Sequence, residues 1–198
     1  MISTRVLVLN SILLISVLTG ACSSQPPVPV NKYYHLQEAN NSGVTAQSKI
    51  SGSVLVMRPR ARGIYNDRAM LFADKATSLE INRYHYHLWA LPPAEMVQEH
   101  ARLFLSKAAI ADKVQSDSRK SDSTAQIEID IRRFEHVRSS NGGAAKVSLR
   151  IRVERNNKIH VNDYEEVIDV SEANMHSVVV AFSKALDRVF TSFVKQLK

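Results

Sequence analysis

The sequence predicts a single α+β domain in which a mixed or antiparallel β-sheet packs against two main helices. Two segments in the second half alternate strictly between apolar and polar residues, as strands with one buried face do, and a hairpin turn leads from the second of them into a third strand. Two other segments, residues 92–108 and 175–197, carry apolar residues at the three- and four-residue steps of an amphipathic helix. The chain has 198 residues, 44% of them hydrophobic and 23% charged, which is typical of one globular domain.

The first 21 residues have the layout of a secretory signal. Arg5 precedes the apolar run Val6–Leu18, and small residues then lead to Cys22, the only cysteine of the chain. The run is too short to cross a bilayer, which takes about 20 apolar residues. Thr19-Gly20-Ala21-Cys22 resembles the lipobox of bacterial lipoproteins. We therefore expect residues 1–21 to be a lipoprotein signal peptide, the alternative being an ordinary signal with a chance cysteine.

The lipobox resemblance implies a diacylglyceryl thioether and an acylated amine, for instance with palmitate, on Cys22. Two or more acyl chains anchor a protein stably to a membrane. In lipoproteins of this kind aspartate after the cysteine favours the inner membrane, so Ser23 implies the outer membrane, facing the periplasm. Residues 22–31 would form an acylated tether, in which three prolines favour an extended spacer.

Apolar runs bounded by polar or proline-containing segments predict four strands in the first half of the domain. These strands are Lys32–Leu36, Ser53–Met57, Met70–Phe72 and Leu79–Leu88. Asn40–Ser48 and Arg60–Arg68 are expected to be loops, and Asp74-Lys75 a turn. Pro92-Pro93 then opens a helix, because proline is tolerated in the first helical turn.

The second half gives the clearest predictions. The loop Ser116–Thr124 leads to three strands, which are the alternating Ile127–Phe134 and Lys146–Glu154, followed by Lys158–Val170. Turns are expected at Asn141-Gly142-Gly143 and at Asn156-Asn157. Ser171 is expected to cap the last helix, whose apolar face runs from Met175 to Leu197 and favours packing on the sheet over lying on a membrane surface.

Catalytic and metal motifs are missing from the sequence. His85 and His87 share one face of a strand and could bind a metal together with His35 or His100, but they alternate with aromatic residues as a packed strand would. The sequence contains neither the GxSxG nucleophile elbow nor a GxGxxG phosphate loop. We expect no enzyme activity, no metal and no cofactor beyond the covalent lipid on Cys22.

The formal net charge of +7 suggests an acidic or anionic partner, and a periplasmic location makes nucleic acid improbable. Candidate contacts to a partner or to lipid headgroups are the alternating Arg58, Arg60 and Arg62, for which a solvated loop edge is the alternative. Further candidates are Lys146, Arg150 and Arg152, on the polar face of a predicted strand, or a free sheet edge that accepts another strand.

The order of several features carries a family resemblance. A lipobox and a proline-rich tether are followed by Lys32-Tyr33-Tyr34-His35-Leu36, then by the strand Ser53–Met57, and then by a stretch from Tyr84 through Trp89 to Pro92-Pro93 that opens a helix. This order resembles the auxiliary lipoproteins of ABC-type lipid transport systems, the group typified by the paraquat-inducible protein C. The resemblance covers essentially the whole mature chain and makes residues 32–198 an ABC-transport auxiliary domain. The motif residues Tyr33, Tyr34, Tyr84, Trp89 and Pro92 are interpreted as structural, with Trp89 packed between its strand and the following helix.

What the resemblance implies is a docking role rather than catalysis. Such a lipoprotein would be the accessory subunit of an MCE-type ABC transporter that moves phospholipid or other apolar molecules between membranes. Its partners would be an MCE-domain periplasmic protein and an inner-membrane permease and ATPase, and it could form homo-oligomers. The alternative is a stand-alone lipoprotein that binds a lipid or hydrophobic ligand between its sheet and its helices.

Overall fold

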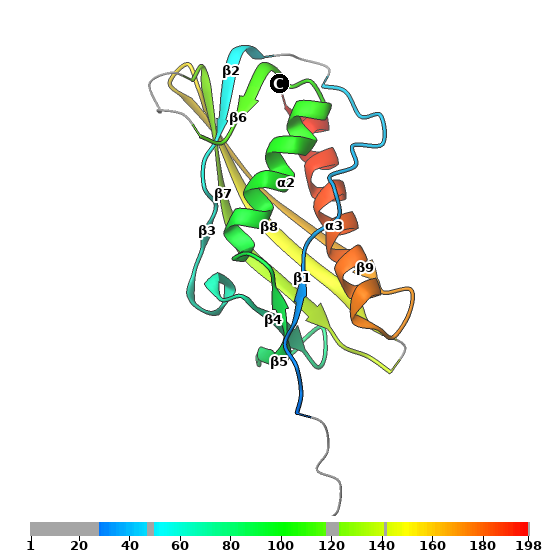
Figure 1. Cartoon of the computed structure of the whole chain (residues 1–198). Helices are drawn as coiled ribbons and strands as arrows, with labels where there is room; N and C mark the ends of the chain where they lie inside the picture. Colours follow the sequence, from blue (N-terminus) through cyan, green and yellow to red (C-terminus); the bar gives the residue numbers. More distant parts are fainter. Residues whose placement is uncertain (1–27, 47–49, 118–122, 141, 198) are drawn as a thin grey trace, which may run out of the picture. The chain divides into compact units, whose positions relative to one another are not determined.

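The computed structural model describes residues 28–46, 50–117, 123–140 and 142–197, so the predicted signal peptide and Cys22 lie outside the described residues. Residues 31–198 form one compact unit. The described strands of this unit join one nine-stranded mixed sheet, and two α-helices cover one of its faces (Figure 1). The predicted α+β class, with a mixed sheet packed by two main helices, is confirmed.

Three long strands form the body of the sheet as an antiparallel meander. They are β7 (Ala125–Val137), β8 (Ala144–Arg155) and β9 (Lys158–Asp169). Alternate residues of β7 and β8 are buried against the helices, including Ile127, Ile129, Leu149 and Ile151, so the predicted alternation is confirmed.

The turn predicted between β8 and β9 is also confirmed. Its two asparagines, at 156 and 157, have φ of 51° and 58°, the left-handed backbone that a two-residue hairpin turn needs.

The other edge of β7 is shared by three short parallel strands, so the sheet forks into arms. In order along β7 they are β2 (Ile50–Val56), β3 (Arg60–Ala61) and β4 (Ala69–Ala73). One arm continues from β2 to the parallel strand β6 (Ala111–Gln115). The other continues from β4 to the antiparallel β5 (Asn82–Trp89) and then to the parallel β1 (Lys32–Tyr34).

The helices lie side by side over this sheet. Helix α2 (Pro93–Lys107) contacts β2 and β6, and helix α3 (Met175–Gln196) contacts β8 and β9. The predicted apolar faces of both helices are buried, and Phe104 of α2 contacts Phe190 of α3 with ring centroids 5.9 Å apart. Neither helix of the described chain has the length and apolarity that a membrane crossing requires.

The predicted cap of the last helix is wrong. The helix begins at Met175, and the side chain of Asn174, not Ser171, accepts the capping hydrogen bond from the Ser177 backbone N–H at 2.9 Å. The Val170 N–H, one residue past β9, donates to the Gly143 carbonyl at 2.8 Å, and residues 171–174 form bends before α3 begins. Serine and asparagine both have the side-chain oxygen that an N-cap needs, and the helix starts at the second of them.

Three shorter segments also differ from expectation. The predicted loop Arg60–Arg68 contains β3 and a short 3-10 helix, η2 (Gly63–Asn66). The predicted strand Leu79–Leu88 begins only at Asn82, and Leu79 is fully exposed. The sequence analysis assigned no structure to β6, whose five residues are too few to show a period. Predicted turn residue 141 and part of the predicted 116–124 loop lie outside the described residues.

Candidate functional site

The outer face of the sheet, away from the helices, carries the basic residues predicted on the β8 strand. Lys146, Arg150 and Arg152 alternate with buried residues of β8, and each pairs with a carboxylate. The pairs are Lys146–Glu165 at 3.1 Å, Arg150–Asp163 at 2.7 Å, Arg152–Glu128 at 2.6 Å and Arg152–Glu154 at 3.1 Å. A partner on this face would therefore meet both signs of charge, rather than a positive patch.

The Arg150–Asp163 pair has two parallel hydrogen bonds. Arg150 Nε and Nη2 donate to the two carboxylate oxygens of Asp163, each at 2.7 Å. This hydrogen bonding holds the pKa of Asp163 below its usual value, and the positive charge of Arg150 acts in the same direction. Because the pair is exposed, it contributes little to stability and mainly fixes the charge pattern of the face.

The three alternating arginines of residues 58–62 do not share one set of contacts. Arg58 pairs with Glu95 in the first turn of α2 at 2.7 Å. Arg60 instead donates to Asp130 of β7 at 2.6 Å, which raises the pKa of the Arg60 guanidinium. Arg62 is exposed and directly precedes η2. The structure therefore does not bring the three side chains together as one binding stripe.

The strand β9 lies at an edge of the sheet. Among the described strands it pairs with β8 alone, over its whole length and without a bulge. Three apolar residues on its outer face are about half exposed, namely Ile159 (53%), Val161 (49%) and Val167 (51%). Sequence reasoning did not select them, although β9 carries apolar residues on both of its faces, which a half-buried strand does not need.

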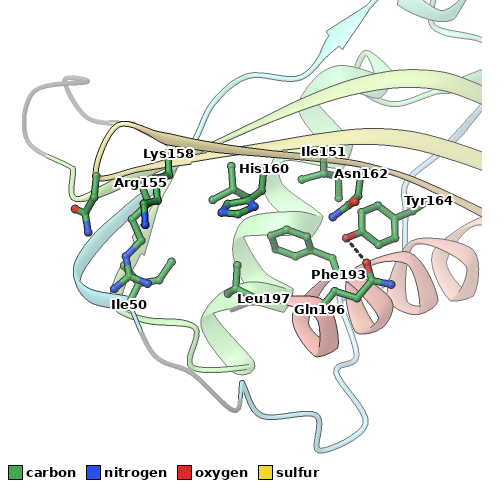
Figure 2. Close-up of a pocket in the computed structure, with 12 residues that line it drawn as sticks. Ile50, Ile151, Arg155, Lys158, His160, Asn162, Tyr164, Phe193, Gln196 and Leu197 are labelled. Carbon is green, nitrogen blue, oxygen red and sulfur yellow. Dashed lines mark hydrogen bonds between the residues drawn. The ribbon is translucent and has the colours of Figure 1, made fainter.

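A cavity of about 370 Å³ opens on the other face of β9, beside the last turn of α3 (Figure 2). It exists because β9 is longer than the helix that covers it. Tyr164 and Ile168 are buried under α3, whereas Lys158, His160 and Asn162 share their face and lie exposed. The helix ends at Gln196, so the first half of β9 projects beyond it.

The cavity has one apolar side, and the side along β9 is polar. The apolar part comes from β2, β8 and the end of α3, and consists of Ile50, Ile151, Val153, Phe193 and Leu197. At one end Tyr164 donates from its hydroxyl to Gln196 Oε1 at 3.1 Å (Figure 2). At the other end lie Arg155 and Lys158, and between the two ends His160 and Asn162 of β9 line the cavity. Sequence reasoning missed this site, although the buried face of β9 changes from basic and polar residues to Tyr164 and Ile168 along the strand.

Two tyrosines of the predicted motif link β5 to other strands, Tyr34 by joining β1 to β5 and Tyr84 by joining β5 to β7. The Tyr34 hydroxyl lies 2.9 Å from Nδ1 of His87, and the Tyr84 hydroxyl lies 2.8 Å from Nδ1 of His136. Burial raises the pKa of both tyrosines and lowers the pKa of both histidines. Tyr33 is half exposed, with the Arg68 guanidinium 5.4 Å from its ring centroid.

Trp89 and Pro92 occupy structural positions. Trp89 is 1% exposed, and its ring centroid lies 5.4 Å from those of Phe134 in β7 and Phe182 in α3. The aromatic contacts of Trp89 are therefore with the last helix and the sheet, whereas the sequence analysis expected the following helix. Pro92 is the N-cap residue of α2, and Pro93 is its first residue.

The described residues contain no group of three or more histidine, cysteine, aspartate or glutamate side chains that could hold a metal ion. His100 is instead buried in a pair with Asp187 at 2.9 Å, and His87 faces Tyr34. Ser183, one turn before Asp187, is also buried, and its hydroxyl donates to the Val179 carbonyl at 3.1 Å. The His100–Asp187 pair ties α2 to α3, and neither residue lines the cavity beside α3.

Two crystal structures share this fold. Protein XCC0632 from Xanthomonas campestris, of the family model DUF330, is 23% identical in sequence and has a TM-score of 0.68. The match covers 82% of this chain and 92% of the Xanthomonas protein. An uncharacterised protein is 11% identical with a TM-score of 0.67, covering 83% and 96%. At these identities the likeness shows the fold alone. No curated protein sequence matches the chain.

The described domain also matches a family model along most of its length. The model is that of the ABC-type transport auxiliary lipoprotein component, and the match runs over residues 34–193. These residues include the end of β1, the fork of the sheet, helix α2 and all but the end of α3. The chain therefore belongs to the family of ABC-type transport auxiliary lipoprotein components.

Proposed function

We propose that this lipoprotein is the accessory and docking subunit of an MCE-type ABC transporter that moves phospholipid or other apolar molecules between membranes. Membership of the transport auxiliary family supports the auxiliary role. The observation that carries the docking role is the open edge of β9, whose outer face exposes Ile159, Val161 and Val167. The proposed partner is the MCE-domain periplasmic protein, served by an inner-membrane permease and ATPase.

The β9 edge is suited to strand addition. Its outward backbone N–H and C=O groups can pair with an extended segment, and side-chain contacts then select the partner. Natural edge strands are usually protected by bulges, prolines or inward charges. In β9 the register runs without irregularity from Lys158 to Asp169, no proline is present, and the acidic Asp163 and Glu165 are paired to β8. A 12-residue edge that lacks this protection favours a partner.

The proposed location is the outer membrane, facing the periplasm. A lipid-modified Cys22 would hold the domain there, and residues 22–31, with Pro26, Pro27 and Pro29, would form the spacer. Docking needs an anchor, a spacer and a rigid domain with an exposed edge, and it needs no catalytic group. The buried His100, paired with Asp187, fits this non-enzymatic role.

The test is site-specific photo-crosslinking of the full-length protein in cells that carry the transporter. A photoreactive residue replaces Val161, and the matched control replaces Lys184, which is exposed on α3. We expect the Val161 position to give a covalent product containing an MCE-domain protein, and the Lys184 position to give none. Equal yields from both positions, or a Val161 product that contains only a second copy of this chain, would overturn docking through β9.

A substitution makes the same test quantitative. Val161→Asp should lower recovery of the MCE-domain protein in a pull-down by about tenfold or more, because a charge would enter the apolar centre of the contact. Lys184→Asp, the matched control, should leave recovery unchanged.

A second candidate function, binding of a lipid or hydrophobic ligand by the lipoprotein itself, is favoured by the cavity beside α3.

A further inference from the structure

One end of the cavity beside α3 is cationic, and the described residues that line this end include no carboxylate. Arg155 closes β8 and Lys158 opens β9, and these two residues stand directly opposite each other in the ladder. His160 is the next residue of β9 on the same face, and the residues that line the cavity include no aspartate or glutamate. Like charges placed directly opposite on paired strands are destabilising, so the fold concentrates positive charge here at a cost.

One atom of this end is also left without a partner. Arg155 Nε is buried and makes no hydrogen bond within the described part of the chain. A buried donor that lacks an acceptor costs free energy, and the cost is greater for a charged group. The outer-face arginines of β8, Arg150 and Arg152, are each satisfied by carboxylates. Arg155 differs from them because it faces the cavity (Figure 2).

The rest of the cavity suits a hydrocarbon chain. Beyond the cations, one side of the cavity is the apolar wall of Ile151, Val153 and Phe193, and its far end is the hydrogen-bonded pair of Tyr164 and Gln196. His160 and Asn162 line the opposite side, along β9. Small-molecule sites range from about 300 to 1,000 Å³. At about 370 Å³ the cavity is near the lower limit, which favours one acyl chain over the two chains of a phospholipid.

We infer that this cavity binds a single-chain anionic lipid, with its headgroup on Arg155 and Lys158 and its acyl chain along Phe193. A carboxylate or a phosphate would supply the anion that the lining of the cavity does not offer to the Arg155 guanidinium and the Lys158 ammonium. The shared chemistry is one acyl chain with one anionic head, as in a free fatty acid or a lysophospholipid of acidic headgroup. The inference does not depend on the docking role, since the cavity and the exposed valines lie on opposite faces of β9.

The experiment uses the full-length protein reconstituted in phosphatidylcholine nanodiscs. Three photoreactive probes with the same long acyl or alkyl chain are compared: a fatty acid, a lysophosphatidic acid and, as the neutral control, a fatty alcohol. Labelled peptides are located by mass spectrometry. We expect both anionic probes, or one of them, to label the peptides that contain β9 or Phe193 at concentrations about tenfold lower than the alcohol does, and the stronger anionic probe identifies the source.

Two variants sharpen this test. Arg155→Gln should weaken labelling by the anionic probe about tenfold or more, the effect of losing a charged hydrogen bond, and should leave the alcohol unchanged. The matched control is Arg132→Gln, an exposed arginine at the bulge of β7. Asn162→Trp should fill the cavity and abolish labelling by all three probes, while circular dichroism shows that the protein stays folded.

Several outcomes would overturn the inference. These are labelling that maps outside the cavity, equal labelling by the alcohol and the anionic probes, or an Arg155→Gln variant that binds like Arg132→Gln. Failure here would leave the docking proposal intact, because the crosslinking at Val161 reports the other face of the strand.

Discussion

At the scale of single residues, His136 is a buried imidazole held in its neutral form by two partners. Nε2 lies 2.6 Å from the Gly142 carbonyl, to which it donates, so Nδ1 accepts from the Tyr84 hydroxyl at 2.8 Å. Burial lowers the pKa of His136 below its ordinary value, mainly because the charged form would lose its water. The unfolded chain therefore binds this proton at a higher pH than the folded protein does.

The sign of the pH effect follows from this difference. Below a pH of about 6.5 the unfolded state takes up a proton that the folded state resists, so the free energy of unfolding falls as the pH falls toward the lowered pKa. Replacing His136 by Gln removes the titration, and it costs about 1–3 kcal/mol at a pH of about 7.5 through the lost buried hydrogen bonds. Urea unfolding, followed by the fluorescence of Trp89, the single tryptophan, measures the free energy of unfolding of both proteins. The difference between wild type and His136→Gln should be smaller at a pH of about 5.5 than at a pH of about 7.5.

The control for this prediction is His35→Gln. His35 is exposed, so its replacement should change the free energy of unfolding at a pH of about 7.5 by less than about 0.5 kcal/mol. Parallel pH curves for wild type and His136→Gln would contradict the argument. Burial also lowers the pKa of His87. Because His87 is present in both wild type and His136→Gln, its effect on the free energy of unfolding is common to the two proteins.

Asp187 is a second residue with more than a local role. Its Oδ1 pairs with the buried His100 of α2 at 2.9 Å and accepts from the backbone N–H of Asn40 at 3.0 Å. One carboxylate on α3 therefore fixes α2 and the segment after β1. Asp187→Ala leaves both groups without this acceptor and should lower the free energy of unfolding by about 1–3 kcal/mol.

The matched control for Asp187→Ala is Lys184→Ala, which truncates an exposed side chain on the same helix. It should change the free energy of unfolding by less than about 0.5 kcal/mol. Equal urea midpoints for Asp187→Ala and Lys184→Ala would show that His100 and Asn40 find other acceptors.

At the scale of elements, helix α2 ends in a motif that its sequence does not favour. The Ile110 N–H donates to the Leu105 carbonyl at 3.3 Å and the Ala109 N–H to the Ser106 carbonyl at 3.0 Å, a Schellman motif. The left-handed position of this motif usually carries glycine, but here Ala109 takes it with φ of 53°. An alanine in this conformation costs about 1–2 kcal/mol.

Ala109→Gly should therefore raise the free energy of unfolding by about 1 kcal/mol, less than the full strain because glycine also gains entropy in the unfolded chain. The neighbouring Ala108 has helical φ of −77°. Ala108→Gly should consequently lower the free energy of unfolding by about 0.5–1 kcal/mol. Thermal unfolding of the two variants distinguishes them by sign. A destabilised Ala109→Gly would contradict the strain argument.

The accuracy of prediction from sequence also varies by element, for a physical reason. The strands β7 and β8 and the two helices were predictable because each is long enough to repeat its period and buries one face. The short strands β3 and β6 were not, because they are stabilised by pairing with distant strands rather than by their own pattern. The cap at Asn174 was not predicted either, because Ser171 and Asn174 both have cap chemistry and both lie in the segment between β9 and α3.

At the scale of the whole molecule, the candidate site was the least predictable part. The cavity joins residues from β2, β8, β9 and α3, whose meeting depends on α3 ending before β9 does. No local pattern records that difference in length. The basic residues that were predicted from the sequence, such as Arg150, face carboxylates on neighbouring strands. Arg155 was not predicted as a site residue, and its Nε has no hydrogen-bond partner within the described residues.

Attachment of the whole molecule to its membrane can be tested at two adjacent residues. Cys22→Ala removes the thiol that we propose carries the lipid, so this variant should incorporate no alkyne-labelled palmitate and should be lost from the outer-membrane fraction of a density gradient. Ser23→Asp keeps the thiol and is the matched control, which should stay labelled but move to the inner-membrane fraction. Palmitate label on Cys22→Ala would contradict lipidation at this residue. A Ser23→Asp variant that stays in the outer membrane would leave lipidation standing and would contradict only the role assigned to Ser23 in sorting.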